Sequence, residues 1–136
     1  LRLRERLPGA VATAGTLEDL ASGTAAVAWA RTRGWSGSSG EELAASYAAG
    51  DRVAVDAVRR PACAVREAIA RVATLLDLDV AVIAGGFANV TDDYIDLVRE
   101  AAHDSAVFDY ARRVRIVPTG LDGRGPLVGA ASLVLR

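Results

Sequence analysis

Apolar residues recur every three or four positions over much of the chain, a spacing typical of helices that bury one face. The clearest stripe lies between residues 62 and 79, where Val65, Ile69, Val72 and Leu76 share one face. The same spacing predicts further helices over residues 17–21, 24–33, 41–49, 51–60, 91–104 and 127–136. We therefore expect a fold that is rich in helices.

Two stretches break this spacing and predict β-strands. Residues 80–84 are all apolar and lead into Gly85 and Gly86, which suits a strand buried on both faces of a parallel sheet. A second β-branched run, 112–119, contains Pro118 near its end. Two parallel strands joined through a helix form a right-handed βαβ unit, but two strands alone make a poor sheet beside this many helices. We expect additional strands to come from sequence outside this chain.

Hydroxyl side chains mark the predicted helix starts. Thr16 is an expected N-cap, and Ser39 is followed three residues later by a glutamate, which is the pattern of a capping box. Thr24 and Thr91 are predicted to cap their helices in the same way. Pro61 lacks a backbone N–H, so we expect a break or kink in the helical region around it.

Composition and charge exclude several classes of protein. The chain has 136 residues, 51% of them hydrophobic and 24% charged, which suits one packed domain or part of one. A net charge of −1 gives no sign of a nucleic-acid or membrane surface. The single cysteine, Cys63, excludes an internal disulfide, fits a reducing cytoplasm and is expected to be a small buried apolar residue. The chain lacks lysine, which excludes Schiff-base chemistry and a P-loop lysine within it.

Four motifs, in order, resemble the C-terminal part of the ROK family of repressors and sugar kinases. They are GTLEDLASGTAAVA from Gly15, the Gly-Asp pair at 50–51, VAVIAGGFANV from Val80, and RIVPTGLDGRGPLVGAASLVL from Arg115. The resemblance implies an α/β fold of the actin-like, ribonuclease-H-like ATPase type. Residues 16–136 would form its C-terminal lobe, helix-rich with two parallel strands and incomplete without the N-terminal portion. Residues 1–15 would be an edge segment that includes a degenerate zinc loop.

The family's zinc loop is written roughly C-x-C-G-x-x-G-C, with a histidine just upstream. In this chain the cysteine positions fall on Gly9, Val11 and Thr16, and the histidine would lie at or before Leu1. Since none of these residues supplies a thiolate, we expect no zinc.

The resemblance also implies a sugar contact at Glu18, the acid that follows the Gly-Thr-Leu segment. A carboxylate accepts hydrogen bonds from two sugar hydroxyls, and its charge strengthens them. The alternative is that Glu18 is an ordinary first-turn acid that interacts with the helix dipole.

A nucleotide contact is implied for the glycine pair that ends the first strand. Without side chains, Gly85 and Gly86 let adenosine approach the backbone, and Phe87, Ala88 and Asn89 would line the adenine and ribose edge. The alternative is a strand-to-helix turn that needs a positive φ angle.

Other residue pairs have plainer explanations. His103 beside Asp104 suggests a base but fits a surface helix end better. Trp29 and Trp35 are able to stack on a sugar, although core or dimer packing is the preferred interpretation. The acids at 92–93 fit helix capping better than a magnesium site.

The function that the resemblance implies is that of a glucokinase-like sugar kinase. Joined to its N-terminal lobe, the chain would help transfer a phosphoryl group from ATP, with Mg2+, to a hexose hydroxyl. The catalytic aspartate would lie upstream, so this segment alone is expected to be inactive. We expect a cytoplasmic homodimer with hexose and ATP as ligands and no membrane partner.

Two other functions stay open. One is the sugar-sensing domain of a ROK-type transcriptional regulator without catalysis, which would bind DNA only through an upstream helix-turn-helix domain. The other is a helix-rich oligomerisation module. An upstream phosphate loop would indicate the kinase, and an upstream basic helix-turn-helix domain would indicate the regulator.

Overall fold

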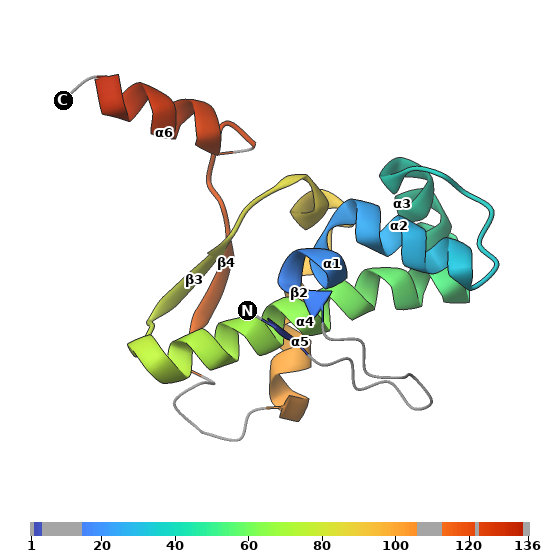
Figure 1. Cartoon of the computed structure of the whole chain (residues 1–136), viewed down its shortest axis with the longest axis horizontal. Helices are drawn as coiled ribbons and strands as arrows, with labels where there is room; N and C mark the ends of the chain where they lie inside the picture. The colour runs from blue at the N-terminus through green and yellow to red at the C-terminus, as the bar shows by residue number, and fades with distance from the viewer. Residues whose placement is uncertain (1, 4–14, 106–112, 122, 135–136) are drawn as a thin grey trace.

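The computed structural model of the chain describes residues 2–3, 15–105, 113–121 and 123–134 (Figure 1). The elements, in order, are β1 (Arg2–Leu3), β2 (Gly15–Thr16), α1 (Leu17–Ala21), α2 (Gly23–Thr32), α3 (Gly40–Ala48), α4 (Arg52–Leu76), β3 (Val80–Ile83), the 3-10 helix η1 (Gly86–Asn89), α5 (Tyr94–Ser105), β4 (Arg115–Pro118) and α6 (Gly125–Val134). The predicted helix-rich α/β class is confirmed.

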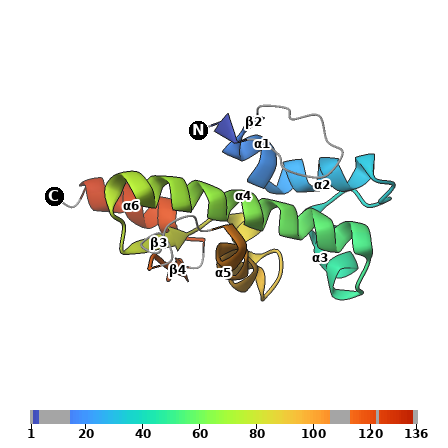
Figure 2. The same ribbon diagram turned by 90° about the horizontal axis from the view of Figure 1, so that it is seen from below.

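Helix α4 is the centre of the molecule. It contacts α1, α2, α3 and α5, and in Figure 2 it lies between α1 and α2 on one side and the sheet with α5 on the other. Asp51 caps its start by accepting the Ala54 N–H at 2.9 Å, and Asp77 ends it in the left-handed conformation at φ 50°. Among the described residues, no helix has the length and apolar content to cross a membrane.

The predicted break at Pro61 is wrong. Helix α4, which is 25 residues long, runs through Pro61 without interruption, and the proline ring is fully buried. A proline in a helix removes one hydrogen bond and crowds the preceding turn, which opposes the helix locally. Here Ala57 and Val58 before the proline and Ala62 and Ala64 after it are buried too, so packing along the whole helix outweighs the local cost.

The predicted caps of α1 and α3 are confirmed. Thr16 forms a reciprocal capping box with Asp19: the Asp19 N–H donates to Thr16 Oγ1 at 3.2 Å and the Thr16 N–H donates to Asp19 Oδ2 at 2.8 Å. Ser39 accepts the Glu42 N–H at 3.2 Å. The Glu42 carboxylate reaches back to the Ser38 N–H at 2.6 Å, one residue earlier than a standard capping box.

The other two predicted caps are wrong. Ser22, and not Thr24, caps α2 by accepting the Ala25 N–H at 3.2 Å. Helix α5 begins at Tyr94, so Thr91 lies in the preceding turn, where its carbonyl accepts the Tyr94 N–H at 3.2 Å. In both cases a second residue of a type that caps helices lies close by, Ser22 near Thr24 and Asp93 near Thr91, so the sequence alone did not decide between them.

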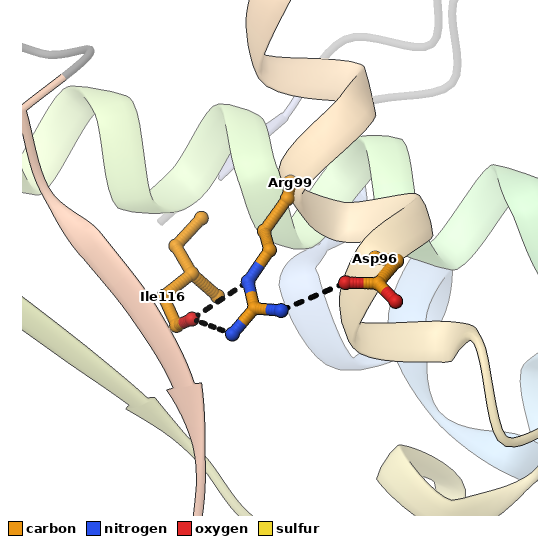
Figure 3. Close-up of polar contacts among 3 residues, drawn as sticks. All are labelled: Asp96, Arg99 and Ile116. Atoms are coloured by element: carbon orange, nitrogen blue, oxygen red, sulfur yellow. Dashed lines mark hydrogen bonds and ion pairs between the residues drawn. The ribbon is translucent and has the colours of Figure 1, made fainter.

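Strands β3 and β4 form the predicted parallel pair, with Val80 opposite Arg115. The Arg115 N–H donates to the carbonyl of Asp79, just before β3, and the Thr119 N–H donates to the carbonyl of Ile83 in β3. By the two-residue alternation, the Ile116 carbonyl therefore faces the outer edge of β4. There it accepts hydrogen bonds from the Arg99 side chain of α5, from Nε at 2.9 Å and from Nη2 at 2.7 Å, while Nη1 donates to Asp96 (Figure 3). Arg99 thus fastens the helix to the edge of the sheet.

The expectation that β3 is buried on both faces is wrong for this chain. The Val82 side chain is 63% exposed, because no described element covers that face of the strand. Helix α6 is also uncovered: in Figure 1 it stands beyond the ends of the strands, and Leu127 and Leu133 are 73% and 75% exposed. We call these residues, with Leu75, Leu76, Leu121, Val128 and Val134, the apolar end.

The main core lies at the other end of the molecule. Its buried members come from α2, α3, α4, α5 and β4, and many of them are alanines, so the helices approach one another closely. Trp29 and Trp35 are half-buried against this core, which confirms the core-packing interpretation. The expectation for Cys63 is wrong: this residue is exposed, although its neighbours Ala62 and Ala64 are buried.

Candidate functional site

Strand β3 leads into a turn that only glycine adopts without strain. Gly85 follows β3 with a φ of +113°, and its carbonyl accepts the Ala88 N–H at 3.1 Å as η1 begins. A Cβ atom built on Gly85 or on Gly86 would meet no other atom within 4 Å. The backbone at the end of β3 therefore borders open space.

That space is part of a pocket of about 850 Å³. It lies where η1 faces the starts of two helices, α2 and α3, which are separated from η1 by more than forty residues of sequence. Helix η1 contributes Gly86, Phe87 and Asn89, three of the predicted nucleotide-binding residues. Gly85 and Ala88 are not among the lining residues, although they shape the turn that presents the others.

The helix starts supply small and polar groups to the pocket. Ser22, Gly23 and Thr24 come from α2, with the two hydroxyl oxygens 3.1 Å apart, and the segment 38–41 comes from the start of α3. The first turn of a helix has backbone N–H groups without helical partners, so both starts offer hydrogen-bond donors. The next turns of the same two helices add apolar side chains to the lining, including Val27 of α2 and Ala44 of α3.

Charge distinguishes the two helix starts. Helix α3 carries Glu41 and Glu42 in its first turn, which offset the positive end of its dipole, whereas α2 carries no acid there. Hydrogen bonding from its own backbone N–H, and from Ser39, holds the pKa of Glu41 below its usual value. Arg31 adds one cation to the lining. The pocket thus combines an apolar wall with hydroxyls, N–H donors and one charge of each sign.

The Phe87 ring, which lines the pocket, packs against a second aromatic ring. The Phe87 ring meets the Tyr94 ring edge to face, with centroids 5.5 Å apart and an interplanar angle of 77°. Tyr94 is only 2% exposed, and burial raises the pKa of its hydroxyl to about 12. Tyr94 is therefore a neutral, fixed support for Phe87.

Glu18 lies close to the pocket in sequence but does not line it. Its side chain is exposed in the first turn of α1, and its carbonyl accepts the Ser22 N–H at 3.1 Å. Helices α1 and α2 are therefore linked directly, which places Glu18 one turn before the polar start of α2. Its role as a sugar contact stays a prediction.

The other candidates give no catalytic group. Asp93 accepts a hydrogen bond from the Tyr47 hydroxyl at 2.6 Å, a contact that joins α3 to the start of α5. The side chain of His103 and the zinc-loop positions Gly9 and Val11 lie outside the described residues. In the described part of the chain, no three His, Cys, Asp or Glu residues gather as a metal site would require.

Comparison with known proteins identifies the family of the chain. A model of the ROK family matches residues 5–136. The chain belongs to the ROK family. Its structure is similar to the crystal structure of a ROK family glucokinase from Streptomyces griseus in complex with glucose and AMPPNP, with a TM-score of 0.76, 25% sequence identity, and coverage of 96% of this chain and 49% of that one.

A second solved structure, a candidate sugar kinase from Cytophaga hutchinsonii ATCC 33406, has a TM-score of 0.75 and 18% identity and covers 90% of this chain and 45% of its own. These neighbours have the actin-like ATPase fold, and the ROK chain spans about half the length of each. No curated protein sequence matches the chain significantly.

Sequence reasoning predicted three of the fifteen residues that line the pocket in this ROK chain, and missed the side formed by the helix starts. It found the glycine turn because strand, Gly-Gly and helix follow one another directly. It did not find Arg31 or the segment 38–41, because their approach to η1 is a tertiary contact with no local signal. The only sequence sign was that Ser39 begins a helix, as serine caps do in many proteins.

Proposed function

We propose that this chain is the C-terminal half of a ROK-type sugar kinase and that the pocket binds the adenosine part of ATP. The observation that carries the proposal is the meeting of the Gly86 backbone, Phe87 and two helix starts in one pocket. The ROK glucokinase with a similar fold binds AMPPNP, an ATP analogue, and glucose. A volume of about 850 Å³ lies in the range of typical small-molecule sites, roughly 300–1,000 Å³.

The lining residues suit the parts of adenosine. The Phe87 ring and the apolar side chains of Val27 and Ala44 offer surface to a purine, which is planar and weakly polar on its faces. Hydroxyls of Ser22 and Thr24 and the N–H groups of the helix start offer partners to the polar edge of the base or to the ribose. The bare backbone at Gly86 allows close approach.

In phosphoryl transfer the protein contributes mainly by positioning the reactants and by stabilising the phosphate charge. Mg2+ bound to ATP would neutralise phosphate charge, but the described residues contain no cluster that fits a metal. We therefore assign no Mg2+ ligand and no general base to this half. Alone it is expected to be catalytically inactive, and a turnover of ATP and glucose by the isolated 136-residue chain would contradict that.

We propose that Glu18 binds the sugar. Its exposed carboxylate lies one turn from the polar start of α2, so a hexose bound there would be adjacent to the nucleotide. Glu18→Gln keeps the shape and removes the charge that strengthens bonds to hydroxyls. In the protein as its gene encodes it, this change should raise KM for the hexose by about tenfold and leave KM for ATP within about twofold. An equal rise in both constants would rule out a separate sugar contact.

The nucleotide pocket is tested by filling it. A valine at Gly86 would project into open space without a strained φ angle, so Gly86→Val should block the ligand and leave the fold intact. Gly120 is the matched control, because it is also exposed, also has open space for a Cβ, and does not line the pocket. By isothermal titration, Gly86→Val should weaken AMPPNP binding at least about tenfold and Gly120→Val should not. Equal affinities in both variants would refute the nucleotide assignment.

The same titrations also distinguish a kinase from the alternative function, a sugar-sensing transcriptional regulator. The resemblance places Thr16 where the family has a zinc cysteine, and here Thr16 serves as a helix cap. Sugar binding without ATP binding or turnover in the protein as its gene encodes it would favour a sugar-sensing regulator. Homodimerisation, and DNA binding through an upstream domain, stay predictions.

A further inference from the structure

Gly23, which lines the pocket, has a neighbouring side chain close to it, whereas Gly40 at the start of α3 does not. Gly23 is the first residue of α2, and a Cβ built on it would lie 3.1 Å from Phe87 Cδ2 and 3.8 Å from Phe87 Cβ and Cγ. A separation of 3.1 Å is shorter than ordinary van der Waals contact between carbons, which is about 3.5–4.0 Å. The Phe87 ring therefore occupies the place of a side chain at position 23.

Gly40 has the same position in the partner helix. It is the first residue of α3 and lines the same pocket, yet a Cβ built on it would meet no atom within 4 Å. An alanine would thus fit freely at position 40, whereas at position 23 the Phe87 ring would have to give way by a few tenths of an ångström. The helix itself does not explain the difference, because alanine is a better helix residue than glycine at either start.

The movement of the Phe87 ring is limited by Tyr94, which is 2% exposed, belongs to the main core and meets the ring edge to face at 5.5 Å. Close-packed cores yield little to an added methyl group. A side chain at position 23 would therefore require the Phe87 ring to shift by a few tenths of an ångström, which changes the room left in the pocket that both residues line.

We infer that Gly23 is a positioning residue: its missing side chain seats the Phe87 ring against the start of α2 and so sets the room that the pocket leaves for a nucleobase. This inference rests on the proposed nucleotide site and adds a residue that would act through Phe87 and not through contact of its own side chain. It also explains why a glycine follows the Ser22 cap, where most residues would serve.

The test compares five forms of the protein as its gene encodes it: the unchanged protein, Gly23→Ala, Gly120→Ala, Phe87→Leu, and the double variant Gly23→Ala with Phe87→Leu. The probe is AMPPNP, titrated by calorimetry. Gly23→Ala should weaken binding about tenfold, whereas Gly120→Ala, at an exposed glycine that does not line the pocket, should stay within about twofold of the unchanged protein. Thermal unfolding should show that both alanine variants remain folded, since alanine favours the helix at position 23 and a Cβ at position 120 would meet no atom within 4 Å.

The double variant separates positioning from a general defect. A leucine at position 87 is smaller than a phenylalanine, so adding Gly23→Ala to Phe87→Leu should cause no further loss, and the two changes should be non-additive. Equal affinities for Gly23→Ala and Gly120→Ala, or full additivity in the double variant, would overturn the inference. Failure of the unchanged protein to bind AMPPNP would instead overturn the proposed function.

Discussion

A single side-chain hydrogen bond joins two elements that form one side of the core. The Tyr47 hydroxyl on α3 donates to the Asp93 carboxylate, which precedes α5, at 2.6 Å. Partial burial and this bond raise the pKa of Tyr47 to about 12, so the hydroxyl remains a donor at neutral pH. The same bond holds the pKa of Asp93 below its usual value of 3.8.

The Tyr47–Asp93 bond should therefore contribute stability that depends on pH. Because the pKa of Asp93 is lower in the folded state, its contribution is complete above the ordinary value of 3.8 and is lost as the pH falls through the lowered folded value. Tyr47→Phe should lower the free energy of unfolding by about 0.5 kcal/mol at pH 7, a small effect because the pair is exposed. It should also move the pKa of Asp93 up toward 3.8, as measured by carboxyl NMR titration.

Asp92→Asn is the control for the Tyr47–Asp93 bond, since Asp92 is the exposed neighbouring acid. It should leave the pKa of Asp93 nearly unchanged. If Tyr47→Phe also leaves that pKa unchanged, the hydroxyl is not the group that stabilises the carboxylate.

Individual residues were predictable where their neighbours in sequence decide their role. Thr16 and Ser39 cap helices as expected, and Gly85 needs the positive φ that the strand-to-helix turn suggested. Cys63 was misjudged because an apolar residue in an alanine-rich helix says little about which face it occupies. The closeness of Gly23 to Phe87 had no signal at all, since it joins segments far apart in the chain.

The helices and strands are joined by a small number of specific contacts. Arg99 of α5 gives two of its N–H groups to the Ile116 carbonyl on the outer edge of β4 and a third to Asp96 (Figure 3). An uncovered strand edge presents unpaired backbone groups, and here a guanidinium occupies part of that edge. The bond from a charged donor to a carbonyl that is otherwise turned outward is stronger than a neutral bond.

Replacement of Arg99 should loosen the junction between α5 and β4. Arg99→Met keeps much of the side-chain length but removes every donor, so we expect a loss of about 1–2 kcal/mol in the free energy of unfolding, measured by urea denaturation. Asp96→Ala removes only the exposed partner of the pair and should cost about 0.5 kcal/mol or less. Similar losses for both variants would mean that the surface ion pair, and not the bond to β4, carries the effect.

Elements were predictable in type and order but not in extent. The periodic stripe and the β-branched runs placed α4, β3, α5 and β4 in sequence, because side-chain spacing reports directly on the local conformation. The break expected at Pro61 failed because four neighbouring helices pack against α4, and this burial exceeds the local penalty of the proline. Local rules describe a residue's preference, whereas the extent of a helix depends on what covers it.

Burial is unevenly distributed over the whole molecule. The core is closed around α4, whereas the apolar end exposes Val82, Leu127 and Leu133. We proposed that this chain is one half of a kinase, and both solved neighbours are about twice the length that it spans. Sequence patterns pointed to the exposed strand face only indirectly, as a sheet with too few strands. On the proposed function, we infer that the apolar end is the face on which the other half of such a kinase would pack.

Helix α6 should therefore be stable only in the longer protein. It has ten residues, no residue buried, and no described neighbour against which its apolar side chains pack, and isolated helices shorter than about 12–15 residues are marginal in water. In hydrogen exchange of the 136-residue chain, the amides of α6 should exchange nearly as fast as in an unfolded peptide. In the protein as its gene encodes it, they should be protected. The amides of α4 around Val58 and Ala62, which are buried in this chain already, serve as the internal control and should be protected in both samples. If α6 exchanges equally fast in the longer protein, the apolar end is not covered by the other half, and the assignment of this face is wrong.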